Sequence, residues 1–318
     1  MYEIFWNQKR VTYFKQISKR LKPKMKLVHS EIQAEVLNLK ETIKPKYVRI
    51  NRLLCSEPVS KVLKKTKAES DKDIPDLLVF PDSNSCKIDL SSTEFIVQDK
   101  ASCTPPFLLQ EYVMKVVKEE VKELVVMDAC AAPGNKSLQL LQYFGEVICI
   151  EKDEKRFNIL VKRLKKYAGN NESVTYSTIN EDFRKLKEKW EGGRVDYILI
   201  DTSCSGTGNN DTAENYPELK EALNECIKDI DYNILYTSLN AKLQEKIKRL
   251  SGFQKELLSV ALTWKGIKGV VYSTCSIFPQ ENEEVIQSVL EQYSEYKLQA
   301  VPSKIGHPGF LVLCFMNK

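Results

Sequence analysis

The sequence lacks the usual signature of a zinc-binding protein. Only two of its 318 residues are histidines, His29 and His307, and its nine cysteines are scattered without a single C-x-x-C pair. Zinc sites normally combine closely spaced cysteines and histidines. We therefore expect no bound metal, and we expect most of the cysteines to be small, buried apolar side chains.

Long apolar segments are also absent. No run in the sequence approaches the roughly 18 residues that a membrane-spanning helix requires. The first residues do not resemble a signal peptide either. These absences predict a soluble intracellular protein with reduced thiols.

Charge is distributed unevenly along the chain. Residues 1–68 contain 17 Lys and Arg against five Asp and Glu, a net charge of +12. Because the whole chain carries +5, the other 250 residues carry −7. A basic N-terminal part on a mildly acidic body is typical of a nucleic-acid-binding module joined to a catalytic domain. A solvated basic face without a partner is the alternative explanation.

The pattern of predicted elements divides the chain into two domains, 1–95 and 96–318. The first begins with a helical leader over residues 1–45, in which apolar residues recur every three or four positions between basic ones. A small α/β module follows, with strands at Lys46–Leu54 and Leu77–Phe80. A short helix is expected between them, around Val59–Leu63.

In the second domain strands and helices alternate, and several strands are apolar throughout, which suits a sheet covered on both faces. This pattern predicts a Rossmann-like α/β domain with a doubly wound parallel sheet. A polar, helix-prone insertion over residues 209–250 has no predicted role. The expected strands are Leu124–Asp128, Val147–Glu151, Val174–Ser177, Val195–Asp201, Gly269–Thr274 and Phe310–Phe315, and the expected helices are Ser137–Tyr143, Lys155–Tyr167, Phe183–Trp190 and Phe253–Trp264.

A loop of small residues, from Asp128 to Ser137, follows the first of these strands. Such a loop lets a ligand approach the backbone closely, beside the unpaired N–H groups of the next helix. It matches neither G-x-G-x-x-G nor a P-loop, so neither a dinucleotide nor a nucleoside triphosphate is indicated.

Two acidic residues extend this candidate ligand site. Glu151 ends the second strand and could accept hydrogen bonds from both hydroxyls of a ribose, while Asp182 follows the third and could bind an adenine amine. Each acid alone is as often a helix cap, but together they favour S-adenosylmethionine, which needs no phosphate clamp. The candidate cofactor residues are Cys130, Ala131, Ala132, Pro133, Gly134, Asn135, Lys136, Glu151, Arg156, Asp182 and Asp201.

Two further strands end beside a cysteine. YILIDTSCSGTG places Cys204 just beyond Asp201, and VVYSTCSI ends in Cys275. The carboxyl ends of parallel strands meet at one edge of a sheet, where such folds bind ligands. Two thiols and a carboxylate at that edge suggest covalent chemistry on an electron-poor ring.

These motifs resemble those of a known family. DACAAPGNK, DTSCSGTG and YSTCSIFPQENEEVI, with KYVRIN at Lys46–Asn51 and QDKAS at Gln98–Ser102, are similar to the motifs of Sun-type RNA cytosine-5 methyltransferases. Asn135, where most of the family has glycine, resembles the branch that acts on large-subunit ribosomal RNA; asparagine tolerates a left-handed backbone. Thr202 departs from the usual proline, which should loosen the turn before Cys204.

The resemblance implies a role for each reactive residue. Cys275 would be the nucleophile that adds to C6 of a cytosine flipped out of its stack, and Cys204 would assist release of the 5-methylcytosine product. Asp201 would hold the N3 and N4 edge of the base, and Lys136 would help to hold the base and lower the thiol pKa. Chemistry alone leaves the order of the two thiols open, because both lie at the same edge.

Ribosomal RNA, free or in pre-ribosomal particles, is the expected partner of a monomeric enzyme. Phosphate contacts from the basic module would recognise it. Arg49 and Asn51 are candidate RNA contacts, although a purely structural role on a polar strand face explains them almost as well. The expected location is the nucleus or nucleolus in a eukaryote and the cytoplasm otherwise.

Other functions fit the sequence less well. Transfer RNA is the alternative substrate, and a non-catalytic RNA-binding assembly factor is the alternative function. The joint presence of Cys204, Cys275, Asp201 and Lys136 argues against a non-catalytic protein. A DNA cytosine methyltransferase would have a Pro-Cys nucleophile at the fourth strand, and an amino-directed enzyme would carry N/D-P-P-Y, which is absent.

Overall fold

The structure of the chain is a computed structural model. It describes residues 45–81, 86, 88–169, 171, 174–208, 236–237, 239–293, 296–300 and 311–317. The helical leader expected over residues 1–45 lies outside the described residues except for Pro45, and so do residues 209–235 and 238 of the expected insertion.

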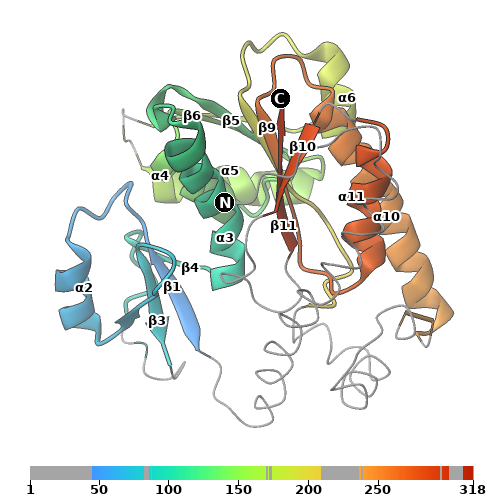
Figure 1. Cartoon of the computed structure of the whole chain (residues 1–318). Helices are drawn as coiled ribbons and strands as arrows, with labels where there is room; N and C mark the ends of the chain where they lie inside the picture. The colour runs from blue at the N-terminus through green and yellow to red at the C-terminus, as the bar shows by residue number, and fades with distance from the viewer. Residues whose placement is uncertain are drawn as a thin grey trace.

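A small antiparallel sheet forms the first part of the described chain (Figure 1). Its strand order is β2-β3-β1-β4, and α2 packs against it through Val62, which joins Val48, Ile50, Leu78 and Phe80 in one apolar cluster. The elements are β1 (Lys46–Ile50), α2 (Val59–Thr66), β2 (Glu69–Ser70), β3 (Leu77–Phe80) and β4 (Phe95–Val97).

A seven-stranded sheet forms the second part, in the order β10-β11-β9-β8-β5-β6-β7. The five strands from β9 to β7 are parallel, which confirms the predicted Rossmann-like fold. At the other edge β11, which corresponds to the expected strand Phe310–Phe315, runs antiparallel to β9 and to β10. Neither this antiparallel direction nor the strand β10 was predicted. The strands are β5 (Val125–Asp128), β6 (Glu146–Ile150), β7 (Thr175–Ile179), β8 (Tyr197–Asp201), β9 (Gly269–Thr274), β10 (Tyr296–Ala300) and β11 (Leu311–Asn317).

Helices cover both faces of this sheet (Figure 1). On one face lie α3 (Lys100–Tyr112), α4 (Asn135–Tyr143) and α5 (Glu154–Ala168), and on the other lie α6 (Phe183–Leu186), α10 (Ala241–Leu262) and α11 (Glu283–Leu290). Short helical turns complete the described chain at η3 (Val113–Val117), η4 (Val121–Glu123), η5 (Lys187–Lys189) and η6 (Pro279–Glu281).

The alternation of side chains along the strands builds two cores. In β8, Tyr197 and Leu199 join the cluster under α3, α4 and α5, whereas Ile198 and Ile200 join the cluster under α6, α10 and α11. Successive strand residues point to opposite faces, so a strand buried on both faces must be apolar at every position.

Helix α3 connects the two sheets. Leu109 packs into the core of the large sheet, while Phe107 and Leu108 pack with Leu77 of the small sheet. These contacts of α3 hold the small sheet against the large one.

Candidate active site

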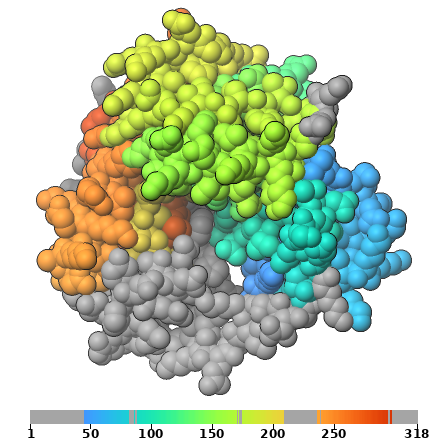
Figure 2. Space-filling view, turned by 180° about the vertical axis from the view of Figure 1, so that it is seen from behind, coloured from blue at the N-terminus to red at the C-terminus, as the bar shows by residue number. Residues whose placement is uncertain are grey.

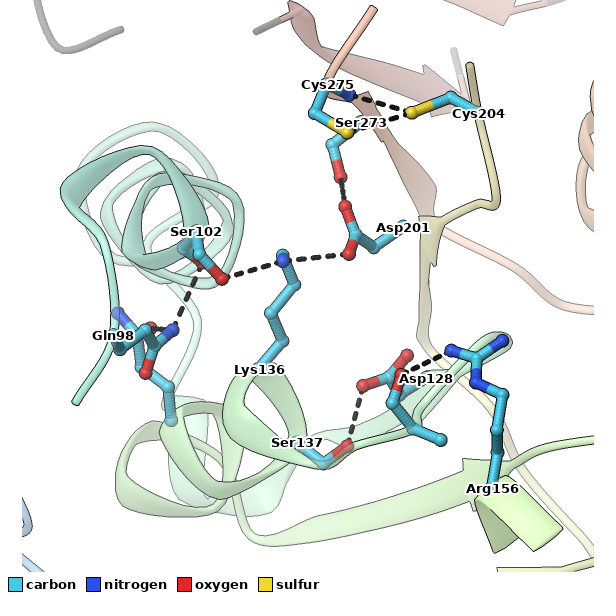
Figure 3. A network of polar contacts seen from close by, with 12 residues as sticks. Gln98, Ser102, Asp128, Lys136, Ser137, Arg156, Asp201, Cys204, Ser273 and Cys275 are labelled. Carbon is cyan, nitrogen blue, oxygen red and sulfur yellow. Dashed lines mark hydrogen bonds and ion pairs between the residues drawn. The ribbon is translucent and has the colours of Figure 1, made fainter. Parts of the chain in front are cut away.

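The carboxyl ends of the parallel strands bring most of the predicted site residues together. Asp128 ends β5, Glu151 follows β6, Asp201 ends β8 and Cys275 follows β9. Figure 3 shows these strand ends facing the start of α4, which carries Lys136. In Figure 2 the segments after β8 (yellow) and β9 (orange-red) lie in a recess beside α10 (orange).

An ion pair lies at the centre of this group. The Nζ of Lys136 is 2.8 Å from Oδ2 of Asp201 and donates to the hydroxyl of Ser102, at 2.9 Å. The Ser273 hydroxyl donates to the other Asp201 oxygen at 2.7 Å (Figure 3). Burial alone would lower the pKa of Lys136, but the charges of Asp201 and Asp128 outweigh it and raise that pKa above its ordinary value. Lys136 is therefore held as a cation.

The two predicted thiols are in contact. Cys204 Sγ lies 2.9 Å from Cys275 Sγ, and the Cys275 backbone N–H donates to Cys204 Sγ at 3.3 Å (Figure 3). The hydrogen bond from Cys204 lowers the pKa of Cys275, outweighing burial and the charge of Asp201; Lys136 adds a smaller lowering effect. The same contact, followed by burial, raises the pKa of Cys204. These opposite shifts favour a thiolate at Cys275 over one at Cys204.

Hydroxyl groups join the loops that carry the thiols. The Ser205 hydroxyl lies 3.0 Å from that of Thr207 and donates to that of Ser276 at 3.1 Å. The Ile277 N–H donates to Thr207 Oγ1, and the Gly208 N–H donates to the Cys275 carbonyl at 2.8 Å. These contacts hold the two loops together directly beside the reactive sulfur atoms.

Asp128 is a site residue that sequence reasoning missed. Its carboxylate is 1% exposed and accepts a hydrogen bond of 2.7 Å from Ser137, but its Oδ1 has no partner among the described residues. Burial raises the pKa of Asp128 to about 6. A buried carboxylate with a free oxygen suits a cationic ligand group. The only signal in the sequence was its place at a strand end, which Asp128 shares with Asp201.

Glycine at position 134, in the loop after Asp128, is explained by its backbone angle and by the packing of the loop against α5. Gly134 has φ +107°, and a Cβ atom there would lie 3.0 Å from a methyl carbon of Leu160. The left-handed residue is Gly134 and not Asn135, which is the first residue of α4, so the backbone argument for Asn135 is wrong. The Asn135 side chain instead accepts a hydrogen bond from Arg163 of α5.

Three further cofactor candidates lie around this loop. The buried Glu151 side chain accepts the Asp153 N–H at 2.9 Å and pairs with Arg156 at 3.5 Å, and Arg156 also donates to the Ala132 carbonyl. Asp182 caps α6, and the hydrogen bond from Arg184 lowers its pKa. The arrangement fits a nucleoside with a positively charged group, because Glu151 and Asp128 are buried carboxylates at the ends of neighbouring strands.

Cys130, another candidate cofactor residue, lies in a different environment. The Cys130 thiol is packed against the core under α10, and burial raises its pKa, so it is not a reactive group. Within the described residues, no three His, Cys, Asp or Glu side chains converge so as to hold a metal ion. None of the described helices has the length and apolar character needed to cross a membrane.

Arg49 and Asn51 point into the protein. Arg49 is 1% exposed and donates to Gln98, to Gln142 and to the Asn135 carbonyl. Asn51 is fully buried and donates to the carbonyls of Thr93 and Tyr167, at 2.8 and 2.7 Å. Their burial favours the structural alternative over RNA contact: both residues fasten the small sheet to α4 and α5.

Comparisons with known proteins agree with this arrangement. The family model for "16S rRNA methyltransferase RsmB/F" matches residues 113–230 and 237–308. The 25S rRNA (cytosine-C(5))-methyltransferase NSUN5 of Arabidopsis thaliana is 32% identical over 78% of this chain and 41% of its own length. The corresponding Schizosaccharomyces pombe protein, rcm1, is 29% identical over 87% of this chain and 58% of its own length. The chain thus spans about half the length of the curated relatives it matches.

Solved structures share the fold. The crystal structure of PH0851 superposes with a TM-score of 0.65 at 22% identity, covering 87% of this chain and 60% of that one. NSun6 from Pyrococcus horikoshii superposes with a TM-score of 0.61 at 16% identity, covering 88% of this chain and 92% of that one. With the family model matching more than half of its residues, the chain belongs to the RsmB/F family of rRNA methyltransferases.

Proposed function

We propose that this protein is an S-adenosylmethionine-dependent RNA methyltransferase that forms 5-methylcytosine in large-subunit ribosomal RNA. The contact between the Cys275 and Cys204 thiols, beside the Lys136–Asp201 pair, is the observation that carries the proposal. Family membership supports the reaction, and similarity to large-subunit rRNA methyltransferases supports the substrate. The large-subunit enzymes of Arabidopsis thaliana, mouse and fission yeast match 75–87% of this chain, and those of Drosophila melanogaster and Caenorhabditis elegans match 65% and 61%. The Vibrio cholerae small-subunit enzyme matches 59%.

Cys275 is the proposed nucleophile. C5 of cytosine does not attack a methyl donor unaided, but a thiolate that adds to C6 shifts the electron pair of the C5–C6 double bond toward C5. The lowered pKa of Cys275 supplies that thiolate. Asp201, whose two oxygens are held by Lys136 and Ser273, is proposed to hydrogen-bond the N3 and N4 edge of the base.

Cys204 is proposed to act in release. After C5 has gained the methyl group, a base removes the C5 proton, the C5–C6 double bond forms again and the C6–S bond breaks. The leaving group is then the Cys275 thiolate, which a hydrogen bond from the protonated Cys204 stabilises. The two cysteines thus act on different steps.

S-adenosylmethionine, when bound, supplies the methyl group. Glu151 is proposed to hold the ribose hydroxyls, Asp182 the adenine and Asp128 the positive charge of the cofactor. The cofactor would lie close to the backbone of the loop around Gly134. Arg156 would hold Glu151 against that loop. The related NSun6 structure, determined with SFG, an analogue of S-adenosylmethionine, supports this cofactor.

RNA is the proposed partner, and residues 1–68, with their net charge of +12, are the proposed recognition part. The domain boundary near residue 95 belongs to this proposal. The eukaryotic relatives suggest work on pre-ribosomal particles in the nucleus or nucleolus.

In vitro methylation tests the function. We expect the protein to transfer labelled methyl groups from S-adenosylmethionine to a large-subunit rRNA transcript, with 5-methylcytosine as the product by mass spectrometry, and we expect Cys275→Ala to abolish transfer. Small-subunit rRNA and tRNA transcripts serve as controls. Methylation of tRNA alone would contradict the substrate, and methylation of a base atom other than C5 would contradict the reaction.

A further inference from the structure

Two adjacent residues outside the strand ends contact the thiol loops on either side. Glu281 ends η6 and Asn282 follows it; they are 0% and 5% exposed. They precede α11 and belong to the FPQENEE stretch, for which the proposed chemistry has no role. Buried polar side chains cost free energy unless they make specific contacts, so the partners of each are informative.

Glu281 holds the loop that carries Cys204. Its Oε1 accepts the backbone N–H of Ser205, the residue after Cys204, at 2.8 Å. The same oxygen accepts Gln254 Nε2 at 3.0 Å, and Gln254 also donates to the Ser203 carbonyl at 3.1 Å. The residues on both sides of Cys204 are thus fixed through one buried carboxylate and its partner on α10.

Asn282 holds the segment that carries Cys275. Its Oδ1 accepts the Thr274 hydroxyl at 2.6 Å, and its Nδ2 donates to the Ser276 carbonyl at 2.8 Å. Thr274 and Ser276 are the direct neighbours of Cys275. The backbone of Glu281 is also fixed, because the Tyr272 hydroxyl of β9 donates to the Glu281 carbonyl at 2.8 Å.

We propose that Glu281 and Asn282 are a pair of positioning residues, in which Glu281 sets the place of Cys204 and Asn282 sets the place of Cys275. The proposal rests on the proposed function, because it assigns the two residues to separate steps of that reaction. Cys204 acts on release and Cys275 on attack, so adjacent substitutions should fail in opposite ways. A general loss of stability would impair both steps in both variants.

Reach, rather than charge, is the property of Glu281 that the contacts require. Glutamine keeps an acceptor oxygen at the same distance from the Ser205 N–H, whereas aspartate keeps the charge but is one methylene shorter. The pair Glu281→Gln and Glu281→Asp therefore separates the two properties. Glu284, exposed in the first turn of α11, provides the matched control Glu284→Asp.

The first test measures the covalent protein–RNA adduct on denaturing gels with S-adenosylmethionine and rRNA. Loss of a hydrogen bond to the charged Glu281 should slow release about tenfold or more, and loss of the two neutral hydrogen bonds of Asn282 should together slow attack by about the same factor. Glu281→Asp should accumulate adduct and Asn282→Ala should form it more slowly, whereas Glu284→Asp should behave as wild type. Glu281→Gln, which removes a charge that raises the pKa of Cys275, should not accumulate adduct. Accumulation in Glu281→Gln but not in Glu281→Asp, or a loss of adduct formation in both Glu281→Asp and Asn282→Ala, would overturn the proposal.

The second test needs neither RNA nor cofactor. Oxidised glutathione converts two neighbouring thiols to a disulfide and yields two molecules of reduced glutathione, so the equilibrium reports how well the thiols are aligned. Peptide mapping should show the Cys204–Cys275 disulfide in the wild type, and Glu281→Asp and Asn282→Ala should each need about tenfold more oxidising conditions. Unchanged equilibria in folded variants would refute the positioning pair even if the methyltransferase function stands. Changed equilibria without any RNA adduct would count against the function instead.

Discussion

The ammonium group of Lys136 lies 2.8 Å from one carboxylate oxygen of Asp201, while the Ser273 hydroxyl donates to the other oxygen. This pair connects the start of α4, where the Asp128–Ser137 loop ends, with the end of β8, where the Cys204 loop begins. Lys136 also lies within electrostatic reach of Cys275, whose pKa it lowers. One side chain thus orients the carboxylate that we propose to bind the base and favours the thiolate that we propose as the nucleophile.

Substitution of Lys136 tests this dual role. In Lys136→Met the pKa of Cys275 should rise, because a positive charge that favours the thiolate is removed. The pH dependence of Cys275 alkylation by iodoacetamide, followed by mass spectrometry, should shift to higher pH. The methylation rate should fall by about 100-fold, as expected when a group that stabilises a reacting charge is lost. An unchanged alkylation profile, with Lys115→Met as the surface control, would remove Lys136 from the electrostatics of the thiol.

Asp128 predicts a pH-dependent stability. Its folded pKa, about 6 against an ordinary 3.8, means that the folded state binds the proton more tightly than the unfolded state. Asp128 therefore contributes to the free energy of unfolding below pH 3.8, and this contribution, about 3 kcal/mol, is lost as the pH rises through 6. Without cofactor, Asp128→Asn should stabilise the protein more at pH 8 than at pH 5 in urea unfolding. An equal effect at both pH values would contradict the buried carboxylate.

Glu151 should be needed for cofactor binding but not for folding. Glu151→Ala should weaken S-adenosylmethionine binding about tenfold or more, because a hydrogen bond to a charged group contributes about 1.5–3 kcal/mol. Calorimetry on the RNA-free protein measures this directly. Asp153→Asn, next to the site, is the control for lost negative charge. Unchanged affinity in Glu151→Ala would place the nucleoside elsewhere.

Asn51 should affect stability and leave RNA binding unchanged. Asn51→Ala leaves the carbonyls of Thr93 and Tyr167 without their donor, which should cost about 1–3 kcal/mol in unfolding free energy. In the folded variant, the dependence of RNA affinity on salt should equal that of the wild type, since no phosphate contact is lost. A smaller salt slope would restore Asn51 as an RNA contact.

The strand ends were predictable, because apolar runs such as Tyr197–Asp201 and Gly269–Thr274 leave little choice of structure. Helix α3 was not predicted, because it contains Pro105 and Pro106, which normally end a helix. Pro106 has no N–H group to donate to the Ser102 carbonyl, as a helical residue at that position normally would. The side chain of Gln98 donates to this carbonyl instead, through Nε2. Helix α10 begins at Ala241, well before the expected Phe253, where Asn240 caps it and Leu243 and Ile247 are buried.

The site was predictable as a set of residues but not as a set of contacts. Asp201, Cys204 and Cys275 could be predicted to lie close together, because all three follow strands that end at the same edge of the sheet. Only the folded chain shows that Lys136 pairs with Asp201. For Arg49, the sequence left two roles open and the structure favours one of them. An arginine on a short strand suits RNA or a buried network equally well, and the packing of the small sheet against α4 decides between them.

The central claim is that Cys275 attacks the cytosine and that Cys204 assists release of the product. Its most direct test is adduct formation by variants in which one of these two cysteines is replaced by alanine. Each variant is incubated with S-adenosylmethionine and large-subunit rRNA and resolved on a denaturing gel. The account predicts protein crosslinked to RNA for Cys204→Ala and none for Cys275→Ala. Crosslinking by Cys275→Ala alone would reverse the two roles, and absence of any adduct from either variant while the wild type methylates would contradict the covalent mechanism.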